Sequence, residues 1–247
     1  MMNEIKQLRW MAMFSSFCGL AIILIYSVIV NTNSMFESNL QLWEVSQDFF
    51  NFLFPLFATI PFCTLLFLEV KEGYLTFVHN RIKLKKYLKL KYQAGALLCG
   101  VSIFLVSFIS FIIILYLIDI RFPVSDAEVE MRYFFDGIRL NQPLIYGFFL
   151  SLWRGLLGIV YYTLTFNLVF FTSNIFIVST GGFIYSLIEN FIFSILGKPQ
   201  YSMTSSLIPT RVSPEWTTIS SLLIGPLILI FFIAVFMFLQ KRRGVFN

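Results

Sequence analysis

Six long apolar stretches limit the folds that this sequence can adopt. They cover residues 11–30, 49–70, 93–118, 143–171, 174–196 and 217–240. A helix needs about 20 apolar residues to cross roughly 30 Å of hydrocarbon, and each stretch meets that length. With 58% hydrophobic and 13% charged residues, the chain carries far less charge than a typical soluble domain, in which about a quarter of the residues are charged. The sequence therefore predicts an all-α, polytopic integral membrane protein with six transmembrane helices in a single transmembrane domain, 1–247.

The boundary between the fourth and fifth stretches depends on one polar cluster, Thr172-Ser173-Asn174. Apolar residues continue on both sides of it, and together the two stretches are far longer than a bilayer is thick. Because a single helix of that combined length does not fit a bilayer, we expect the chain to turn at this cluster.

The positions of Lys and Arg predict which loops are cytoplasmic. The two termini and the segment 71–92 carry twelve of the eighteen Lys and Arg residues, whereas the loops on the opposite side carry five. Cytoplasmic loops of membrane proteins are enriched in these residues. We therefore expect both termini and 71–92 to be cytoplasmic, in a multi-pass protein of the cell (plasma or inner) membrane, with the acidic segment 126–136 facing outward.

The segment 71–92, KEGYLTFVHNRIKLKKYLKLKY, holds seven of these cations. Its simplest interpretation is a topological anchor on anionic membrane lipid, at about 1 kcal/mol for each cation. Leu84, Tyr87 and Leu88 also share one helical stripe with lysines around them, which predicts a helix leading into the third span. Nucleic-acid binding is not expected, because the cations are held at a membrane with no domain around them.

The second span ends in Glu69-Val-Lys-Glu72-Gly73, and the basic run RIKLKKYLKLK (81–91) leads into the third. This order resembles the first cytoplasmic loop of type 2 ABC transporter permeases, which are the six-span membrane subunits of ATP-driven exporters. The resemblance implies that loop 71–92 couples the chain to a separate ATP-binding subunit. The coupling residues that it implies are Glu69, Glu72, Gly73, Arg81, Lys85, Lys86, Tyr87 and Lys91.

The same resemblance implies a permease that works as a dimer, with an identical or a different second permease subunit, and exports a hydrophobic or amphipathic peptide, lipid or drug. ATP and Mg²⁺ would bind to the partner ATPase, since the nearest P-loop match in this chain, Gly95–Ser102, has Val101 where the lysine is required. His79 is the only histidine, so no metal site is expected. The alternatives are a non-transport accessory or sensor subunit and, less favoured, an integral-membrane enzyme.

Two charges and one stripe of small residues lie inside the predicted spans. Arg154 and Glu189 fall at similar depths in the fourth and fifth spans, so we expect them either to pair with each other or to line a substrate pathway. Gly147, Ser151 and Gly155 recur every four residues, a spacing that allows close helix packing.

Overall fold

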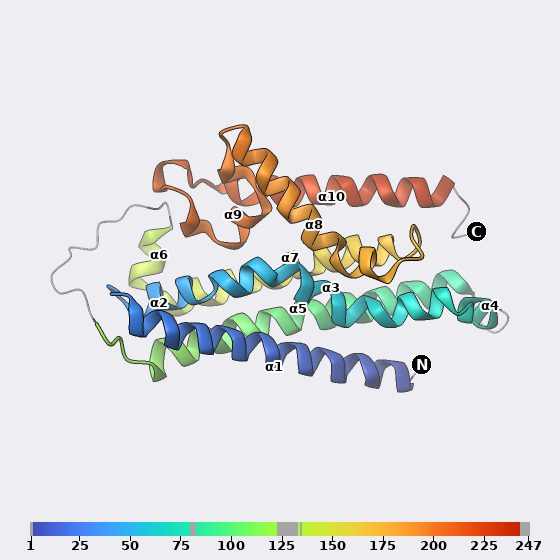
Figure 1. Ribbon diagram of the computed structural model, residues 1–247, viewed down its shortest axis with the longest axis horizontal. Coiled ribbons are helices and arrows are strands. Elements are labelled where there is room, and N and C mark those ends of the chain that lie inside the picture. The colour runs from blue at the N-terminus through green and yellow to red at the C-terminus, as the bar shows by residue number, and fades with distance from the viewer. Residues whose placement is uncertain (1, 80–82, 123–132, 134, 243–247) are drawn as a thin grey trace.

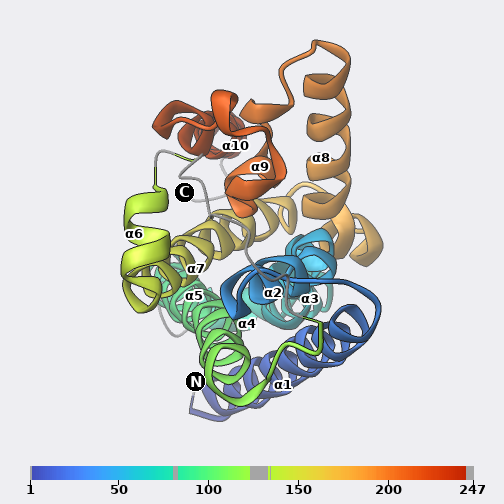
Figure 2. The ribbon, with the colours of Figure 1, turned by 90° about the vertical axis from the view of Figure 1, so that its left-hand side faces the viewer.

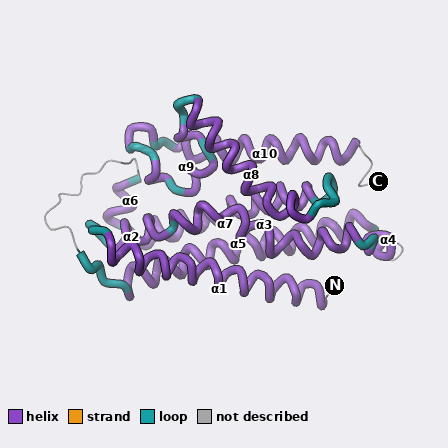
Figure 3. The backbone as a smooth tube through the Cα atoms, in the orientation of Figure 1, coloured by secondary structure: helices purple, strands orange, loops and turns teal. Residues whose placement is uncertain are grey.

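The computed structural model describes residues 2–79, 83–122, 133 and 135–242, and the described part is helical with no strand (Figures 1 and 3). Within it, six helices are long and apolar enough to cross a membrane. They are α1 (Met2–Asn33), α3 (Asp48–Lys71), α5 (Leu84–Leu117), α7 (Pro143–Leu168), α8 (Ile175–Ile195) and α10 (Ile219–Arg242). The chain is therefore a multi-pass membrane protein, and the predicted fold class is confirmed.

Shorter helices connect the long ones. They are α2 (Asn39–Ser46), α4 (Tyr74–His79), α6 (Asp136–Asn141) and α9 (Met203–Leu207), with 3₁₀ turns η1 (Pro199–Tyr201), η2 (Pro209–Arg211) and η3 (Pro214–Trp216). Helix α1 begins and α10 ends at the same end of the bundle as α4, whereas α2 and α6 lie at the opposite end (Figure 1). We refer to these as the α4 end and the α2 end.

Helices α5 and α7 form the centre of the bundle. Seen from the α2 end, α7 lies between α5 on one side and α8, α9 and α10 on the other (Figure 2). The stripe of Gly147, Ser151 and Gly155 on α7 lies against α5: a Cβ atom at Gly155 would come within 2.9 Å of the carbonyl oxygen of Gly100, and Ser151 Oγ donates a hydrogen bond to Ser107 Oγ at 3.1 Å. This close packing occurs within one chain.

Helix α3 joins this centre to α8. The two helices are in extensive contact, and Thr59 Oγ1 on α3 donates a 2.8 Å hydrogen bond to the carbonyl oxygen of Ser179 on α8. Helix α8 is inclined to the other long helices (Figure 1). The N-terminal half of α8 packs against α3, and its C-terminal end meets the segment that carries α9.

The start of one span differs from the prediction, and the boundary between two others is confirmed. Helix α5 runs unbroken from Leu84, so the amphipathic stretch before the third span is the first part of the same helix. Tyr87 and Leu88 are buried, and Lys85, Lys86 and Lys89 are exposed, as the stripe predicts. The predicted turn between the fourth and fifth spans is present: α7 ends at Leu168, and Asn174 Oδ1 caps α8 by accepting the N–H of Phe176 at 2.9 Å.

Candidate functional site

Three of the predicted coupling residues meet at the α4 end of the bundle. Lys91 Nζ on α5 forms an ion pair with Glu69 Oε1 in the last turns of α3. Tyr87 Oη donates a hydrogen bond to the other carboxylate oxygen, Glu69 Oε2, at 3.1 Å. Lys91 Nζ also lies 5.5 Å from the centre of the Tyr87 ring. The side chains of Lys91 and Glu69 are only 8% and 16% exposed, so the contact between α3 and α5 is largely buried. We refer to Glu69, Tyr87 and Lys91 as the coupling cluster.

Local helix geometry explains why these residues meet. Tyr87 and Lys91 are four residues apart and therefore lie on the same face of α5. That face meets the end of α3, where Glu69 is the acceptor. A buried ion pair is stabilising only when its geometry is good and its remaining polar atoms have partners, and the Tyr87 hydroxyl supplies one of them.

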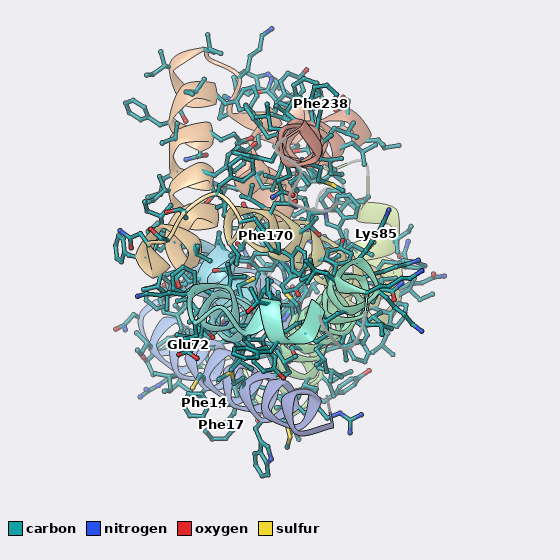
Figure 4. The ribbon with its side chains drawn as sticks, turned by 90° about the vertical axis from the view of Figure 1, so that its right-hand side faces the viewer. Phe14, Phe17, Glu72, Lys85, Phe170 and Phe238 are labelled. Atoms are coloured by element: carbon teal, nitrogen blue, oxygen red, sulfur yellow. The ribbon has the colours of Figure 1, made fainter. Side chains whose placement is uncertain are left out.

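The other predicted coupling residues surround α4 without joining this cluster. Gly73 follows the end of α3 with φ +71°, a left-handed conformation that glycine adopts without a Cβ clash, and α4 begins at the next residue. Glu72, Lys85 and Lys86 are exposed, and Figure 4 shows Glu72 and Lys85 on opposite sides of the α4 end. Arg81 lies outside the described residues.

A cavity of about 450 Å³ and another of about 640 Å³ lie at opposite ends of the bundle, and the larger one adjoins the coupling cluster. It is lined from α3 by Lys71, from α4 by Leu75, from α5 by Leu88 and from the α7–α8 turn by Phe170 and Thr172. Figure 4 shows Phe170 near the middle of this end. This turn was not among the predicted site residues, although its polar cluster, Thr172-Ser173-Asn174, marks a place where the chain reaches one end of the bundle.

Arg154 does not pair with Glu189. Its side chain is 1% exposed, and its Nε donates to the carbonyl oxygen of Leu207 at 3.2 Å. Its Nη1 donates to Ser107 Oγ at 3.0 Å, and its guanidinium carbon lies 5.1 Å from the centre of the Trp43 ring. The buried guanidinium therefore uses a backbone carbonyl, a hydroxyl and an aromatic ring in place of a carboxylate.

Glu189 binds a different backbone group. Both of its carboxylate oxygens accept the N–H of Met203, at 3.0 and 2.9 Å. In the described part of the chain no ion pair joins it to Arg154, so the predicted pair is wrong. The reason is the segment 202–207, which folds back into the bundle and brings its own polar backbone groups between the two side chains.

A second charged cluster, which the sequence analysis missed, lies at the α2 end. Arg139 donates to Glu44 through Nε at 3.0 Å and through Nη2 at 2.7 Å, and Tyr146 Oη donates to Glu44 Oε1 at 2.9 Å. Burial disfavours the charge on Arg139, but the hydrogen bonds and the charge of Glu44 outweigh burial and raise the pKa of Arg139 above its ordinary value. The sequence signal for this contact is that the loop 31–48 contains acidic residues and no Lys or Arg, while another loop predicted on the same side of the membrane contains arginines.

Comparison with protein-family models, with curated proteins and with solved structures finds no match to this chain. Its function is therefore argued from its own residues and their arrangement.

Proposed function

We propose that this chain is the membrane-spanning permease subunit of an ATP-driven ABC exporter, and that α4 with its flanking residues docks on a separate ATP-binding subunit. The observation that carries the proposal is the buried Glu69–Tyr87–Lys91 cluster directly beneath α4. It lies in the segment between the second and third spans that resembles the first cytoplasmic loop of type 2 permeases. In this proposal the α4 end faces the cytoplasm, in the cell membrane.

The cluster supports the proposal because it makes one mechanical unit of two helices. Residues on either side of α4 belong to α3 and α5, and the Glu69–Lys91 pair holds these helices together just below it. A force applied to α4 by a partner would therefore move both spans together. An unlinked loop of similar length would absorb the same force by bending.

The exposed charges around α4 suit a soluble protein partner. Lys83, Lys85, Lys86 and Lys89 are all exposed near the start of α5, while Lys91 is buried in the cluster. Exposed charges of one sign increase the rate at which a complementary surface is found. ATP and Mg²⁺ would be held by that partner, and closure of the partner around ATP would tilt α3 and α5.

The proposal also includes a second permease subunit, identical or different, and a hydrophobic or amphipathic substrate. Helices α1, α8 and α10 expose many large apolar side chains, such as Phe17, Phe191 and Phe231. Lipid and a second permease would cover these faces.

Co-purification from the native membrane in detergent tests the proposal. The chain is compared with the double variant Lys85→Glu/Lys86→Glu and with the matched control Arg121→Glu/Lys198→Glu, which reverses two exposed cations outside the α4 end. We expect a soluble ATPase to co-purify with the unaltered chain and with the control, and to be lost from the double variant. If no ATPase accompanies any of the three, the cations are only a topological anchor and the proposal of an accessory or sensor subunit replaces the permease.

A further inference from the structure

The smaller cavity, of about 450 Å³, lies between α3, α8 and the segment that carries α9 and η2. Its volume is within the range of small-molecule binding sites, about 300–1,000 Å³. It is far from the cluster beneath α4, because the α3 residues that line it belong to the first two turns of that helix. By the charge distribution of the sequence, this end of the bundle faces outward.

Asn51 is a buried amide without a partner in this cavity. Its side chain is 2% exposed, and neither its Nδ2 nor its Oδ1 has a hydrogen-bond partner among the described residues. Buried amides are almost always hydrogen-bonded, because leaving both atoms unpaired is costly. Asn51 therefore offers one donor and one acceptor, side by side, to a molecule that enters the cavity. A peptide group presents the complementary acceptor and donor.

Asp48 lies one turn before Asn51 on the same face of α3 and also lines the cavity. Its carboxylate is exposed and has no hydrogen bond or ion pair within the described residues. The other charged groups of the wall have hydrogen bonds of their own: Glu44 is held by Arg139, and Arg211 Nη1 donates to Asn190 Oδ1 at 3.2 Å. The positive charges of Arg211 and of the buried Arg154 also act on Asp48, without a direct ion pair among the described residues. Among the described residues of this wall, Asp48 is therefore the carboxylate that is free to form a hydrogen bond or an ion pair with a cationic ligand.

Apolar side chains make up part of the remaining wall: Phe52 and Pro55 from α3, Leu187 from α8 and Leu207 from α9. Polar side chains lie between them, among them Tyr161, Ser186, Thr204 and Thr210. A molecule that fits all three features has a positive charge, a peptide group and an apolar side chain in close succession.

We infer that this cavity binds the end of a cationic amphipathic peptide from the side of the α2 end, with Asp48 contacting an ammonium or guanidinium group and Asn51 pairing with a peptide group. The inference goes beyond coupling to an ATPase and does not depend on it, since the site and the α4 end share no residue.

Isothermal titration calorimetry on the purified chain in phosphatidylcholine nanodiscs tests the inference, with empty nanodiscs as the blank. The probes are the tripeptide amide Lys-Phe-Phe-NH₂ and its N-acetylated analogue with norleucine in place of lysine, which carries no charge. We expect saturable binding of the charged probe and about tenfold weaker binding of the neutral one, the size expected when a charge-assisted hydrogen bond is lost.

Three variants separate the site from non-specific binding. Asp48→Asn is expected to weaken the charged probe about tenfold and to leave the neutral probe unchanged. Asn51→Leu is expected to weaken both probes while keeping the melting temperature, because Asn51 makes no hydrogen bond that the variant would lose. The matched control Asp119→Asn changes an exposed carboxylate outside the cavity and should bind both probes normally.

Failure of the charged probe to saturate the unaltered chain, or equal binding by the Asp48 and Asp119 variants, would overturn the inference and leave a cavity filled by water. Neither result would alter the outcome of the ATPase co-purification, so the two proposals fail separately.

Discussion

Arg154 and Glu189 bind opposite ends of one five-residue helix without contacting each other. Glu189 accepts the N–H of Met203, the first residue of α9, and Arg154 donates to the carbonyl oxygen of Leu207, the last. The carboxylate thus lies at the positive end of the helix dipole and the guanidinium at the negative end. Inside a bilayer, irregular backbone is tolerated only where protein groups satisfy its hydrogen bonds, and these two side chains do so.

This arrangement predicts that exchanging the two charges does not restore folding. In Arg154→Glu/Glu189→Arg a carboxylate faces the Leu207 carbonyl and a guanidinium faces the Met203 N–H, so both contacts become repulsive. We expect the double variant to be at least as destabilised as either single reversal, measured as the melting temperature and the yield of monodisperse protein in detergent. Glu189→Gln keeps an acceptor oxygen and should lose only about 1–2 kcal/mol. Recovery by the exchange would mean that the two residues pair directly.

The Glu69–Lys91 pair should behave in the opposite way. Removing one partner leaves a buried charge without compensation, so Glu69→Ala or Lys91→Ala should each cost about 3–5 kcal/mol. The exchange Glu69→Lys/Lys91→Glu should recover most of that loss, because the contact is between side chains. Tyr87→Phe removes one hydrogen bond and should cost about 1 kcal/mol. A double-mutant cycle on the free energy of unfolding measures the coupling, and additive single effects would contradict the pairing.

Gly155 should tolerate no side chain. A Cβ atom there would lie 2.9 Å from the backbone oxygen of Gly100, and a backbone atom cannot move aside as a flexible side chain can. We expect Gly155→Ala to cost about 1–3 kcal/mol by forcing α5 and α7 apart. Gly137→Ala is the matched control, because no atom lies within 4 Å of its Cβ position. Equal melting temperatures for the two variants would show that α7 can shift to make room.

The Arg139–Glu44 contact should depend on the shape of the arginine as well as on its charge. Arg139 donates through two nitrogens to the two oxygens of Glu44, so Arg139→Lys keeps the charge, loses the fork and should cost about 1–2 kcal/mol. The raised pKa of Arg139 means that its stabilisation is fully present below the ordinary pKa of an arginine side chain and is lost only as the pH rises through the raised pKa. The difference in melting temperature between the unaltered chain and the Arg139→Lys variant should therefore be constant from about pH 6 to pH 9. A difference that disappears within this range would contradict the assigned contact.

The sequence predicts the long helices well because their signal is local. Each span is an apolar run of sufficient length, and the α7–α8 turn follows from one polar cluster that supplies the cap Asn174. The resemblance singled out Glu69, Tyr87 and Lys91 as coupling residues, but their contact with one another was not predicted and is a finding of the structure.

Contacts made by the short elements were not predictable in this way. Helix α9 has no apolar periodicity of its own and depends on Arg154, Glu189 and Trp153, whose indole N–H donates to the carbonyl oxygen of Ser206 at 3.1 Å. Depth alone placed Arg154 and Glu189 near each other, but depth does not reveal a backbone segment that lies between them. Glu44 was missed for the same reason, because its partners are about a hundred residues away along the chain.

The unbroken course of α5 has a consequence for motion. Its 34 residues span about 51 Å, well beyond the roughly 30 Å of hydrocarbon that a membrane helix must cross. The portion between Leu84 and Gly100 is held to both neighbouring helices: Tyr92 Oη lies 2.9 Å from Thr163 Oγ1 on α7, and Lys91 pairs with Glu69 on α3. The part of α5 that extends past the hydrocarbon therefore moves together with α3 and α7, so a displacement at Leu84 reaches the centre of the bundle.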